Sequence, residues 1–420
     1  MKIIKVNGLT PIQSGMLFQY MLSNDKSSYM GTEIFELEGN INSDIFKSVL
    51  EKISDEYEVF RTNVIYDKID VPKSVVIDKR TIPFEFHKAV TDEEIKLLTY
   101  KINAEQFEKG FDIQRDSLIR LDLIVGENSS VIIFSFHHIL MDGYCAAMIA
   151  DIIMKNYGKL LGRQIENDGE YVPFSAYQDW IIIQDMSQSR EYWHEYLKDI
   201  SPVQPLELIQ FGSDRKKDVG HSSLTVEFTP SETKELLSAA AAGNATLNIY
   251  MQWLWGITLC RNFSCDKAVF GTVVSYRPAE FSNAERVLGP MINTVPVVFE
   301  CSSDIKITEQ LNAFRRSFLD SMEHSWIGLG EISKAVEDCK NLIDHLFVYD
   351  NFPEMDFGSI KENTGFQVKN FKLEERTEYA LTLEVSKTDR IRIRFNFNSG
   401  RYSAESIERL AELYKNICVS

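Results

Sequence analysis

The sequence contains few cysteines and histidines, the residues that form disulfide bonds and that most often bind zinc. Its six cysteines, at positions 145, 260, 265, 301, 339 and 418, form no CxxC pair among the 420 residues. In a chain of this length, that distribution argues against a disulfide framework and predicts free, buried thiols. The seven histidines cluster at one place only, and no group of histidine, cysteine and aspartate has the spacing of zinc ligands. We therefore expect no bound metal.

Positive charge is also scarce, because 45 lysines and arginines stand against 62 aspartates and glutamates, for a net charge of −17. A polyanion would be repelled, which excludes nucleic acid and an anionic membrane surface as partners. No apolar run is long enough to span a bilayer, and the opening MKIIKVNGLTPIQ lacks the apolar segment of a signal peptide. The phosphate-binding patterns GxGxxG and GxxxxGKS/T are absent as well. We expect a cytoplasmic monomer that binds no nucleotide.

What the chain does contain is a mixture of helix and strand patterns on either side of a polar stretch, 201–220, which is the best candidate for a linker. Thr10 and Gln13 form a capping-box pattern that predicts a helix starting at Pro11. Apolar periodicity predicts further helices at 42–59, 92–107, 144–161, 231–241, 247–263, 307–323 and 403–417, and two more within 173–197. Alternating or continuous apolar runs predict strands at 32–38, 62–66, 74–77, 82–86, 117–125, 131–136, 224–228, 268–274, 294–299, 345–349, 380–385 and 391–397. This content indicates two lobes of α+β type.

The stretch FSFHHILMDGYC, residues 134–145, ends an apolar strand with two histidines and places an aspartate and a glycine before a helix. Side chains alternate along a strand, so His137 and His138 cannot point the same way, and one of them can face a cleft. Asp142 suits the N-cap of the helix, and Gly143 leaves its backbone N–H open to a close approach. A neutral imidazole is the usual general base near pH 7 and contributes roughly 10²–10⁴ in rate.

Two roles are open for Asp142: it can orient an imidazole, or it can pair with a cation and hold the shape of the loop. Cys145 follows within one helical turn and is expected to pack inward, so no nucleophile is marked beside the histidines. A direct transfer between two bound substrates therefore fits better than a covalent intermediate on the enzyme. The plainer alternative is a pair of buried histidines that cap a strand. Two capping histidines would not need an aspartate and a glycine at this spacing before a helix, so the full HHxxxDG pattern favours a functional site.

With these residues the chain resembles the condensation domains of nonribosomal peptide synthetases, whose HHxxxDG motif residues 137–143 match without a gap. The resemblance covers nearly the whole chain, and the further segments that match the family's motifs are LTPIQSGMLFQYML, EYEVFRTNVIY, FSAYQDW, GTVVSYRPAE, LGPMINTVPV and, loosely, HLFVYDNFP. Two departures stand out. Residues 55–57 replace the usual Arg-His start of the segment written RHExLRTxF, and Tyr276 replaces the glycine of VSGRPxE, a change in the expected crossover loop.

The resemblance implies an α+β fold of two chloramphenicol-acetyltransferase-like lobes in a V shape with a central tunnel. The N-terminal lobe with HHxxxDG would span 1–172 and the C-terminal lobe 173–420, with a crossover loop near 271–297. The implied activity is peptide (amide) bond formation, in which an acceptor aminoacyl thioester attacks a donor acyl or peptidyl thioester. Both substrates ride on phosphopantetheine arms of peptidyl carrier proteins, and no cofactor is bound directly. Carrier proteins and adjacent synthetase domains would be the partners, as in antibiotic biosynthesis and other secondary metabolism.

The resemblance also assigns roles to residues of this chain. His138 would face the tunnel and either deprotonate the amine or position and stabilise the transition state. Gly143 would offer its backbone amide there, and His137 would hold the loop. Asp142 would be structural and ion-paired with Arg61. The residues expected in the tunnel wall are Asn293, Ser275 and Tyr276, and a plain strand-start role for Asn293 is the alternative.

The sequence leaves alternatives open for the condensation subtype and for the activity. TPIQSGMLF, HLFVYDNFP and RTEYALTLEV are more similar to condensation domains that accept a D-configured donor residue than to the LSxAQxRLWFL subtype. YCAAMI after the glycine argues against an epimerisation domain, and the two histidines argue against a heterocyclising domain. The competing functions are a non-catalytic condensation-like module that docks carrier proteins, and a small-molecule acyltransferase that uses coenzyme A. The intact HHxxxDG motif favours the enzyme.

Overall fold

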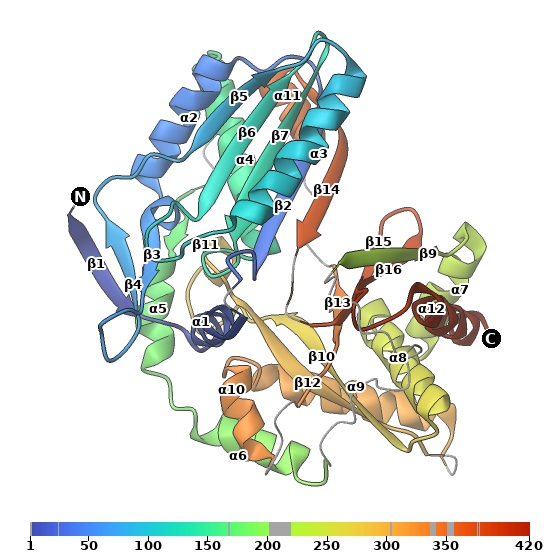
Figure 1. Cartoon of the computed structure of the whole chain (residues 1–420). Coiled ribbons are helices and arrows are strands. Elements are labelled where there is room, and N and C mark those ends of the chain that lie inside the picture. The colour runs from blue at the N-terminus through green and yellow to red at the C-terminus, as the bar shows by residue number, and fades with distance from the viewer. Residues whose placement is uncertain are drawn as a thin grey trace. The chain divides into compact units, whose positions relative to one another are not determined.

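The structure is a computed structural model that describes residues 2–23, 25–166, 169–200, 220–302, 305–336, 342–350, 357–375, 377 and 379–420 (Figure 1). The chain divides into two compact units that exchange segments. Unit 1 comprises Met1–Gln184, Arg277–Met291 and Phe352–Glu378. Unit 2 comprises Asp185–Tyr276, Ile292–Asn351 and Tyr379–Ser420.

Unit 1 contains three sheets and the helices that cover them. Its main elements are β1 (Ile3–Gly8), α1 (Pro11–Ser23), β2 (Met30–Glu38), α2 (Ser43–Glu56), β3 (Thr62–Ile65), β4 (Lys73–Ile77), β5 (Phe84–Lys88), α3 (Asp92–Lys109), β6 (Ile119–Val125), β7 (Ser129–His137), α4 (Gly143–Leu160), β8 (Val172–Pro173), α5 (Phe174–Ile182), β11 (Val287–Leu288), α11 (Phe357–Thr364) and β14 (Gln367–Glu375). The strand orders are β14-β2-β7-β6-β5, β1-β4-β3 and β11-β8. The capping box of Thr10 and Gln13 starts α1 as expected, because each residue's backbone N–H donates to the other's side chain over 3.2 Å.

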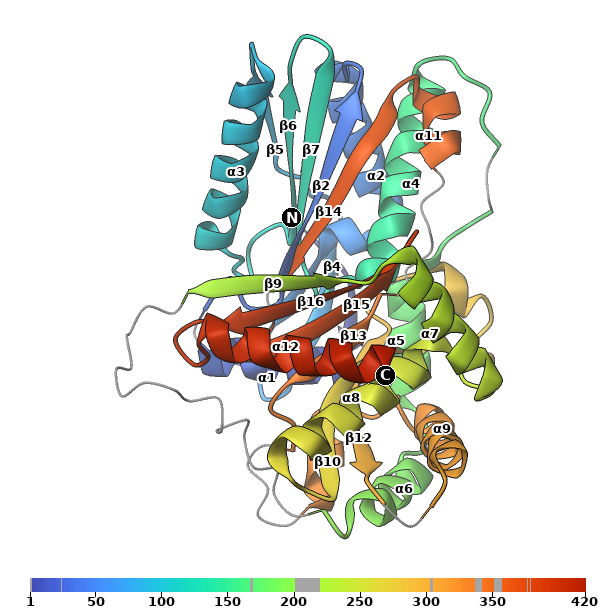
Figure 2. The same ribbon diagram turned by 90° about the vertical axis from the view of Figure 1, so that its right-hand side faces the viewer.

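The five-stranded sheet of unit 1 is covered on both faces, with α3 on one side and α2, α4 and α11 on the other (Figure 2). Ile133 of β7 points toward α3, in a buried cluster with Ile34, Ile95 and Ile124. Phe134, the next residue, points toward the α4 side. Strand β7 lies between β2 and β6 and therefore reads as a continuous apolar run. Its end, which carries the histidine pair, is thus fixed by the core of the unit.

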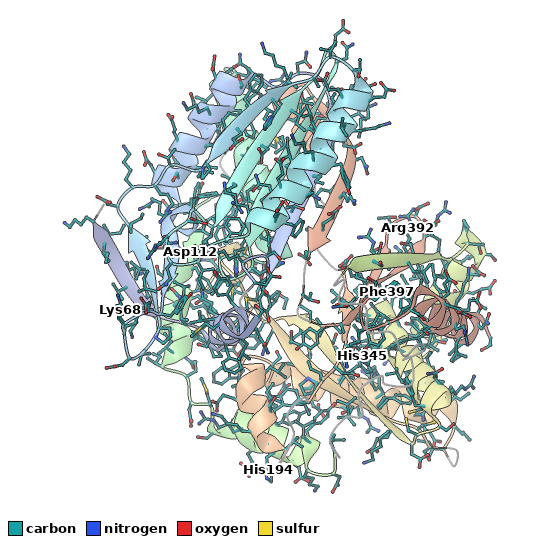
Figure 3. The ribbon with its side chains drawn as sticks, viewed as in Figure 1. Lys68, Asp112, His194, His345, Arg392 and Phe397 are labelled. Atoms are coloured by element: carbon teal, nitrogen blue, oxygen red, sulfur yellow. The ribbon has the colours of Figure 1, made fainter. Side chains whose placement is uncertain are left out.

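Unit 2 is built on one six-stranded sheet in the order β12-β10-β13-β15-β16-β9. Its elements are α6 (Ser187–Leu197), β9 (His221–Glu227), α7 (Pro230–Ala242), α8 (Leu247–Phe263), β10 (Lys267–Ser275), β12 (Ile292–Glu300), α9 (Ile307–Glu323), α10 (Leu329–Ile332), β13 (Leu346–Tyr349), β15 (Leu381–Lys387), β16 (Ile391–Asn398) and α12 (Ala404–Val419). Strand β16 alternates as a half-buried strand should: Phe397 is buried, while Arg392 pairs with Glu227 at 2.9 Å (Figure 3). Among the described residues, no helix combines the length and the apolar character that crossing a membrane requires.

The division of the chain differs from the expected one at 172/173. Helix α5 belongs to unit 1, because Asn7 of β1 donates to the carbonyl of Ser175 and β8 pairs with β11. Residues 277–291, inside the expected crossover region, and β14 also join unit 1, where β14 adds to the edge of the sheet beside β2. The expected linker at 201–220, apart from Gly220, lies outside the described residues.

Candidate active site

The loop between β7 and α4 is held from two other parts of unit 1. The backbone N–H of His138 donates to the carbonyl of Tyr29 over 2.8 Å. The side-chain amide of Gln13 donates to the carbonyl of Ile139 over 2.9 Å. Gln13 therefore does two things: it caps the start of α1 and it fixes the loop that carries the histidines.

His137 is a buried, neutral anchor. Its Nδ1 accepts a hydrogen bond from the backbone N–H of Ile139 at 3.0 Å, and its ring lies edge-on to the rings of Tyr20 and Phe111. Burial, with a smaller contribution from His138, lowers the pKa of His137 to about 3. The ring is therefore uncharged near neutral pH, and its contacts are of the kind expected for a residue that holds the loop.

The ring of His138 contacts different groups, and its side chain is 9% exposed. Its Nδ1 lies 3.2 Å from the carbonyl oxygen of Met141, and its Nε2 lies 3.1 Å from Oε1 of Glu375. The ring packs edge-on against Phe136, with 5.1 Å between ring centroids. Burial alone would lower the pKa of His138, but the Glu375 carboxylate and the Met141 carbonyl outweigh it and raise that pKa above its usual value.

Asp142 anchors the start of α4 and is fully buried. Its Oδ1 accepts from the backbone N–H of Cys145 at 2.8 Å, which makes it the N-cap that the sequence predicts. Its Oδ2 accepts from the backbone N–H of Met291 at 2.9 Å, and Nη2 of Arg277 lies 3.6 Å from Oδ1. Asp142 therefore ties the histidine loop to the segment 277–291.

The expected ion pair between Asp142 and Arg61 is wrong, because Arg277 is the cation beside Asp142. The guanidinium of Arg61 instead donates to backbone carbonyls, with Nε 2.6 Å from the Ser54 oxygen and Nη1 2.8 Å from the Ile77 oxygen. Ser54 lies in the last turn of α2, where carbonyls lack helical partners and attract a cation. Arg61 thus caps α2 rather than binding Asp142.

Arg277 and Cys145 fasten the segment 277–291 onto α4. The guanidinium of Arg277 stacks 4.1 Å above the ring of Tyr144 and donates to the carbonyl of Ala284 at 2.8 Å. The Sγ of Cys145 donates to the carbonyl of Gly289 at 2.9 Å. Burial raises the pKa of Cys145, so its sulfur stays a thiol. Cys145 is therefore a packing residue, as expected, and not a nucleophile.

Sequence patterns did not identify two carboxylates of this sheet, Glu375, which contacts His138, and Glu33, which interacts with Glu375. Both point to the face of the sheet that carries His138, because Glu375 lies opposite Gly31 in the β14–β2 register and Glu33 follows Gly31 by two residues. Burial, then repulsion by Glu375, raises the pKa of Glu33 to about 8, so Glu33 is mostly protonated near neutral pH. The carboxylate that reaches His138 is thus that of Glu375.

A family model described as Condensation domain matches residues 4–418. The chain belongs to the condensation domain family. It is 30% identical to gramicidin S synthase 2 of Aneurinibacillus migulanus over 424 residues, which cover 98% of this chain but only 9% of that synthase. It is also 28% identical to tyrocidine synthase 2 of Brevibacillus parabrevis over 409 residues, which cover 96% of this chain and 11% of that synthase. Condensation domains of this kind occur in nonribosomal peptide synthetases that make antibiotics and other secondary metabolites.

Solved structures support the fold of this condensation domain. The condensation domain of the monacolin K polyketide synthase has a TM-score of 0.81 at 15% identity, covering 100% of this chain and 98% of that one. The starter condensation domain of rhizomide synthetase has a TM-score of 0.82 at 16% identity, covering 99% and 94%. These matches confirm the two-lobed α+β fold of condensation domains, which is similar to the fold of chloramphenicol acetyltransferase.

The other residues that the family resemblance selects are placed as follows. Gly143 is the buried first residue of α4, next to the Asp142 cap. Asn293 of β12 is buried, and its Nδ2 donates to the carbonyls of Ser325 and Ile327, each at 2.6 Å.

Ser275 is exposed at the end of β10, opposite Ile292 of β12, and Tyr276 follows it as the last residue of that segment of unit 2. The place of Asn293, Ser275 and Tyr276 in a tunnel wall stays a prediction.

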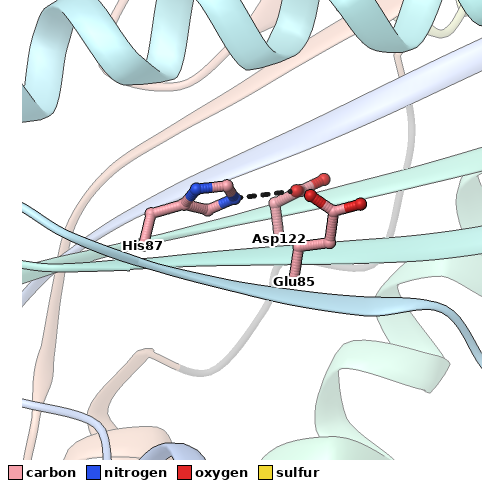
Figure 4. A group of neighbouring side chains, drawn as sticks. All are labelled: Glu85, His87 and Asp122. Carbon is pink, nitrogen blue, oxygen red and sulfur yellow. Dashed lines mark hydrogen bonds and ion pairs between the residues drawn. The ribbon is translucent and has the colours of Figure 1, made fainter.

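One group of metal-ligand type occurs among the described residues of this condensation domain: Glu85, His87 and Asp122 (Figure 4). Glu85 and His87 lie on β5, and Asp122 lies opposite Glu85 on β6. Both oxygens of Asp122 already accept hydrogen bonds, at 3.2 Å from Nε2 of His87 and at 2.7 Å from the amide of Gln106 on α3. We therefore interpret the group as a hydrogen-bonded link between α3 and the sheet.

Proposed function

We propose that the chain forms an amide bond between a carrier-bound donor acyl or peptidyl thioester and a carrier-bound acceptor aminoacyl thioester. The observation that supports this most directly is His138, which stands in an intact HHxxxDG loop with its Nδ1 directed at a backbone carbonyl. A carbonyl oxygen can only accept, so Nδ1 carries a proton and Nε2 is the nitrogen that exchanges protons. Membership of the condensation domain family supports the same reaction.

In the proposed reaction the acceptor nitrogen attacks the thioester carbon of the donor, the C–N bond forms and the C–S bond breaks. The nitrogen must lose protons, and the departing phosphopantetheine sulfur must gain one. Nε2 of His138 accepts a proton from the nitrogen and donates one to the departing sulfur. Asp142 and His137 hold the loop in place. A well-placed acid–base group contributes roughly 10²–10⁴ in rate, and we assign that share to His138.

The donor is proposed to end in a D-configured residue. The support is the similarity of TPIQSGMLF, HLFVYDNFP and RTEYALTLEV to the corresponding segments of that subtype. The test compares the reaction rates of two donors that differ only in the configuration of their last residue. The D form should react at least tenfold faster, and equal rates or a preference for the L form would remove this assignment.

The test mixes the chain with donor-loaded and acceptor-loaded carrier proteins and detects the dipeptidyl carrier by mass spectrometry. His138→Ala should remove the product, whereas the control His194→Ala, an exposed histidine on α6 (Figure 3), should leave it unchanged. Product that persists undiminished in His138→Ala would end the catalytic assignment. Tight carrier binding without product from any loaded pair would favour a docking module. Product formed from acyl-coenzyme A without carriers would favour a small-molecule acyltransferase.

A further inference from the structure

The contact between His138 and Glu375 requires a proton between two acceptors. Nδ1 of His138 faces the Met141 carbonyl oxygen at 3.2 Å and must therefore carry the ring's first proton. Nε2 then lies 3.1 Å from Oε1 of Glu375. A bare ring nitrogen and a bare carboxylate oxygen would repel each other at that distance, so one shared proton lies between them.

The sheet is built so that these two groups can meet. Glu375 of β14 lies opposite Gly31 of β2, and Gly31 lies opposite Phe136 of β7. Strands β14 and β7 are two strand spacings apart, about 9–10 Å, so the side chains must reach toward each other across β2. The Phe136 ring fills the space above Gly31, where a Cβ would come within 2.5 Å of it, and the ring of His138 packs edge-on against Phe136.

The other titratable groups around the pair are neutral or compensated. Glu33 of β2 lies on the same face of the sheet and is mostly protonated near neutral pH, because burial and Glu375 raise its pKa to about 8. His137 on β7 is neutral, since burial lowers its pKa to about 3. Asp142, at the start of α4, is paired with Arg277. The pair of His138 and Glu375, once its shared proton leaves, is therefore a site with two acceptors and one negative charge.

We propose that Glu375 is the residue that recognises the α-ammonium group of the acceptor. One ammonium N–H donates to Oε1 of Glu375 and another to Nε2 of His138, and the ammonium replaces the proton that the pair shares. This inference rests on the proposed function, since it assumes an aminoacyl acceptor. It assigns to Glu375 the recognition of the ammonium and the acceptance of its second proton, and it leaves the first proton transfer to Nε2 of His138.

The proton count of the full reaction balances with this arrangement. Binding releases the shared proton to solvent, and the ammonium then passes one proton to Nε2 and becomes the attacking amine. After the C–N bond forms, the nitrogen loses its second proton to Glu375. The imidazolium gives its proton to the departing sulfur as the C–S bond breaks. His138 and Glu375 are then left with one proton between them, as at the start.

The kinetic test is Glu375→Gln, which keeps the size of the side chain and removes its charge. The matched control is Glu374→Gln, the neighbouring carboxylate that binds Asn103 at 2.7 Å. With a fixed donor-loaded carrier and a panel of aminoacyl-pantetheine thioesters, Glu375→Gln should raise the acceptor KM roughly 10- to 100-fold, as the loss of one charge-assisted hydrogen bond predicts. The donor KM should not change, and Glu375→Asp should recover part of the acceptor affinity. An unchanged acceptor KM, or an equal rise in the control, would overturn the proposal.

A binding test separates this proposal from the proposed function. The probes are unreactive amide analogues of aminoacyl-pantetheine and their α-hydroxy counterparts, measured by calorimetry at neutral pH without any donor. The wild-type chain should bind the ammonium form at least tenfold more tightly and release about one proton on binding. Glu375→Gln should lose both effects while its heat unfolding stays close to that of Glu374→Gln. A wild-type chain that does not discriminate the two probes overturns the inference, whatever the condensation assay shows. A failure of condensation with discrimination intact would count against the proposed function alone.

Discussion

The pairing of Asp142 with Arg277 gives the sharpest stability prediction. Asp142→Asn replaces one acceptor oxygen by an NH2 group, although both oxygens accept backbone N–H bonds, at 2.8 and 2.9 Å. It also leaves the Arg277 charge, on a side chain only 11% exposed, without its partner. Breaking a buried pair in this way costs about 3–5 kcal/mol, and the cap of α4 adds little to this cost, because Asn is as good an N-cap as Asp. Denaturant unfolding of the purified chain measures the loss.

A double-mutant cycle identifies the partner of Asp142. Combining Asp142→Asn with Arg277→Met should give a coupling energy of about 1–3 kcal/mol, because these side chains interact directly. Combining Asp142→Asn with Arg61→Met should be additive within about 0.5 kcal/mol, because Arg61 binds the carbonyls at the end of α2. A larger coupling in the cycle with Arg61, or no coupling in the cycle with Arg277, would refute the pairing of Asp142 with Arg277.

Three further predictions follow from single contacts. Gly31→Ala places a Cβ 2.5 Å from a carbon of the Phe136 ring and should lower the stability measured by thermal unfolding by about 1–3 kcal/mol. The control Gly15→Ala meets no atom within 4 Å and should stabilise α1 by up to about 1 kcal/mol, so equal effects of the two substitutions would contradict the predicted clash with Phe136. Glu33 keeps its proton in the folded chain up to a pH of about 8, whereas in the unfolded chain it loses that proton above its ordinary pKa of 4.5. The free energy of unfolding should therefore fall as the pH rises from about 4.5 toward about 8. Glu33→Gln should flatten this pH dependence, and the exposed control Glu36→Gln should leave it unchanged. Asn293→Ala leaves two buried carbonyls without a donor and should cost about 1–3 kcal/mol in denaturant unfolding; a smaller loss would show that these bonds are replaced.

Much of the fold follows from local patterns in the sequence. Helices α8 and α9 begin and end at the predicted residues, and Thr10 and Gln13 mark the start of α1. The strand-to-helix junction of the histidine motif is also predictable, because β7 is buried on both faces and Asp142 caps the next helix. These features depend on periodicity and on capping, which neighbouring residues determine.

Strand β14 was not predicted, and the reason lies in its sequence and position. QVKNFKLEE carries charged residues on its outer face, and a register shift between Val368 and Asn370 breaks the alternation that identifies a strand. Glu375, the last residue of this strand, was missed with it. A contact between residues 138 and 375 is set by sheet register, and no spacing in the sequence reports it.

The partner of Asp142 could not be chosen from the sequence for a similar reason. Arg61 and Arg277 are both single arginines in segments that match family motifs. Only the return of residues 277–291 to unit 1 brings Arg277 beside α4, while the end of α2 binds Arg61. Long-range packing decides between two chemically equal candidates.

The most direct test of the account is a single-turnover rate measurement with donor-loaded and acceptor-loaded carriers, comparing the wild-type chain with His138→Ala. If Nε2 of His138 moves the protons of amide formation, the first-order rate should fall roughly 10²- to 10⁴-fold while both carriers still bind. A His138→Ala chain that forms the dipeptidyl carrier at the wild-type rate would contradict the account.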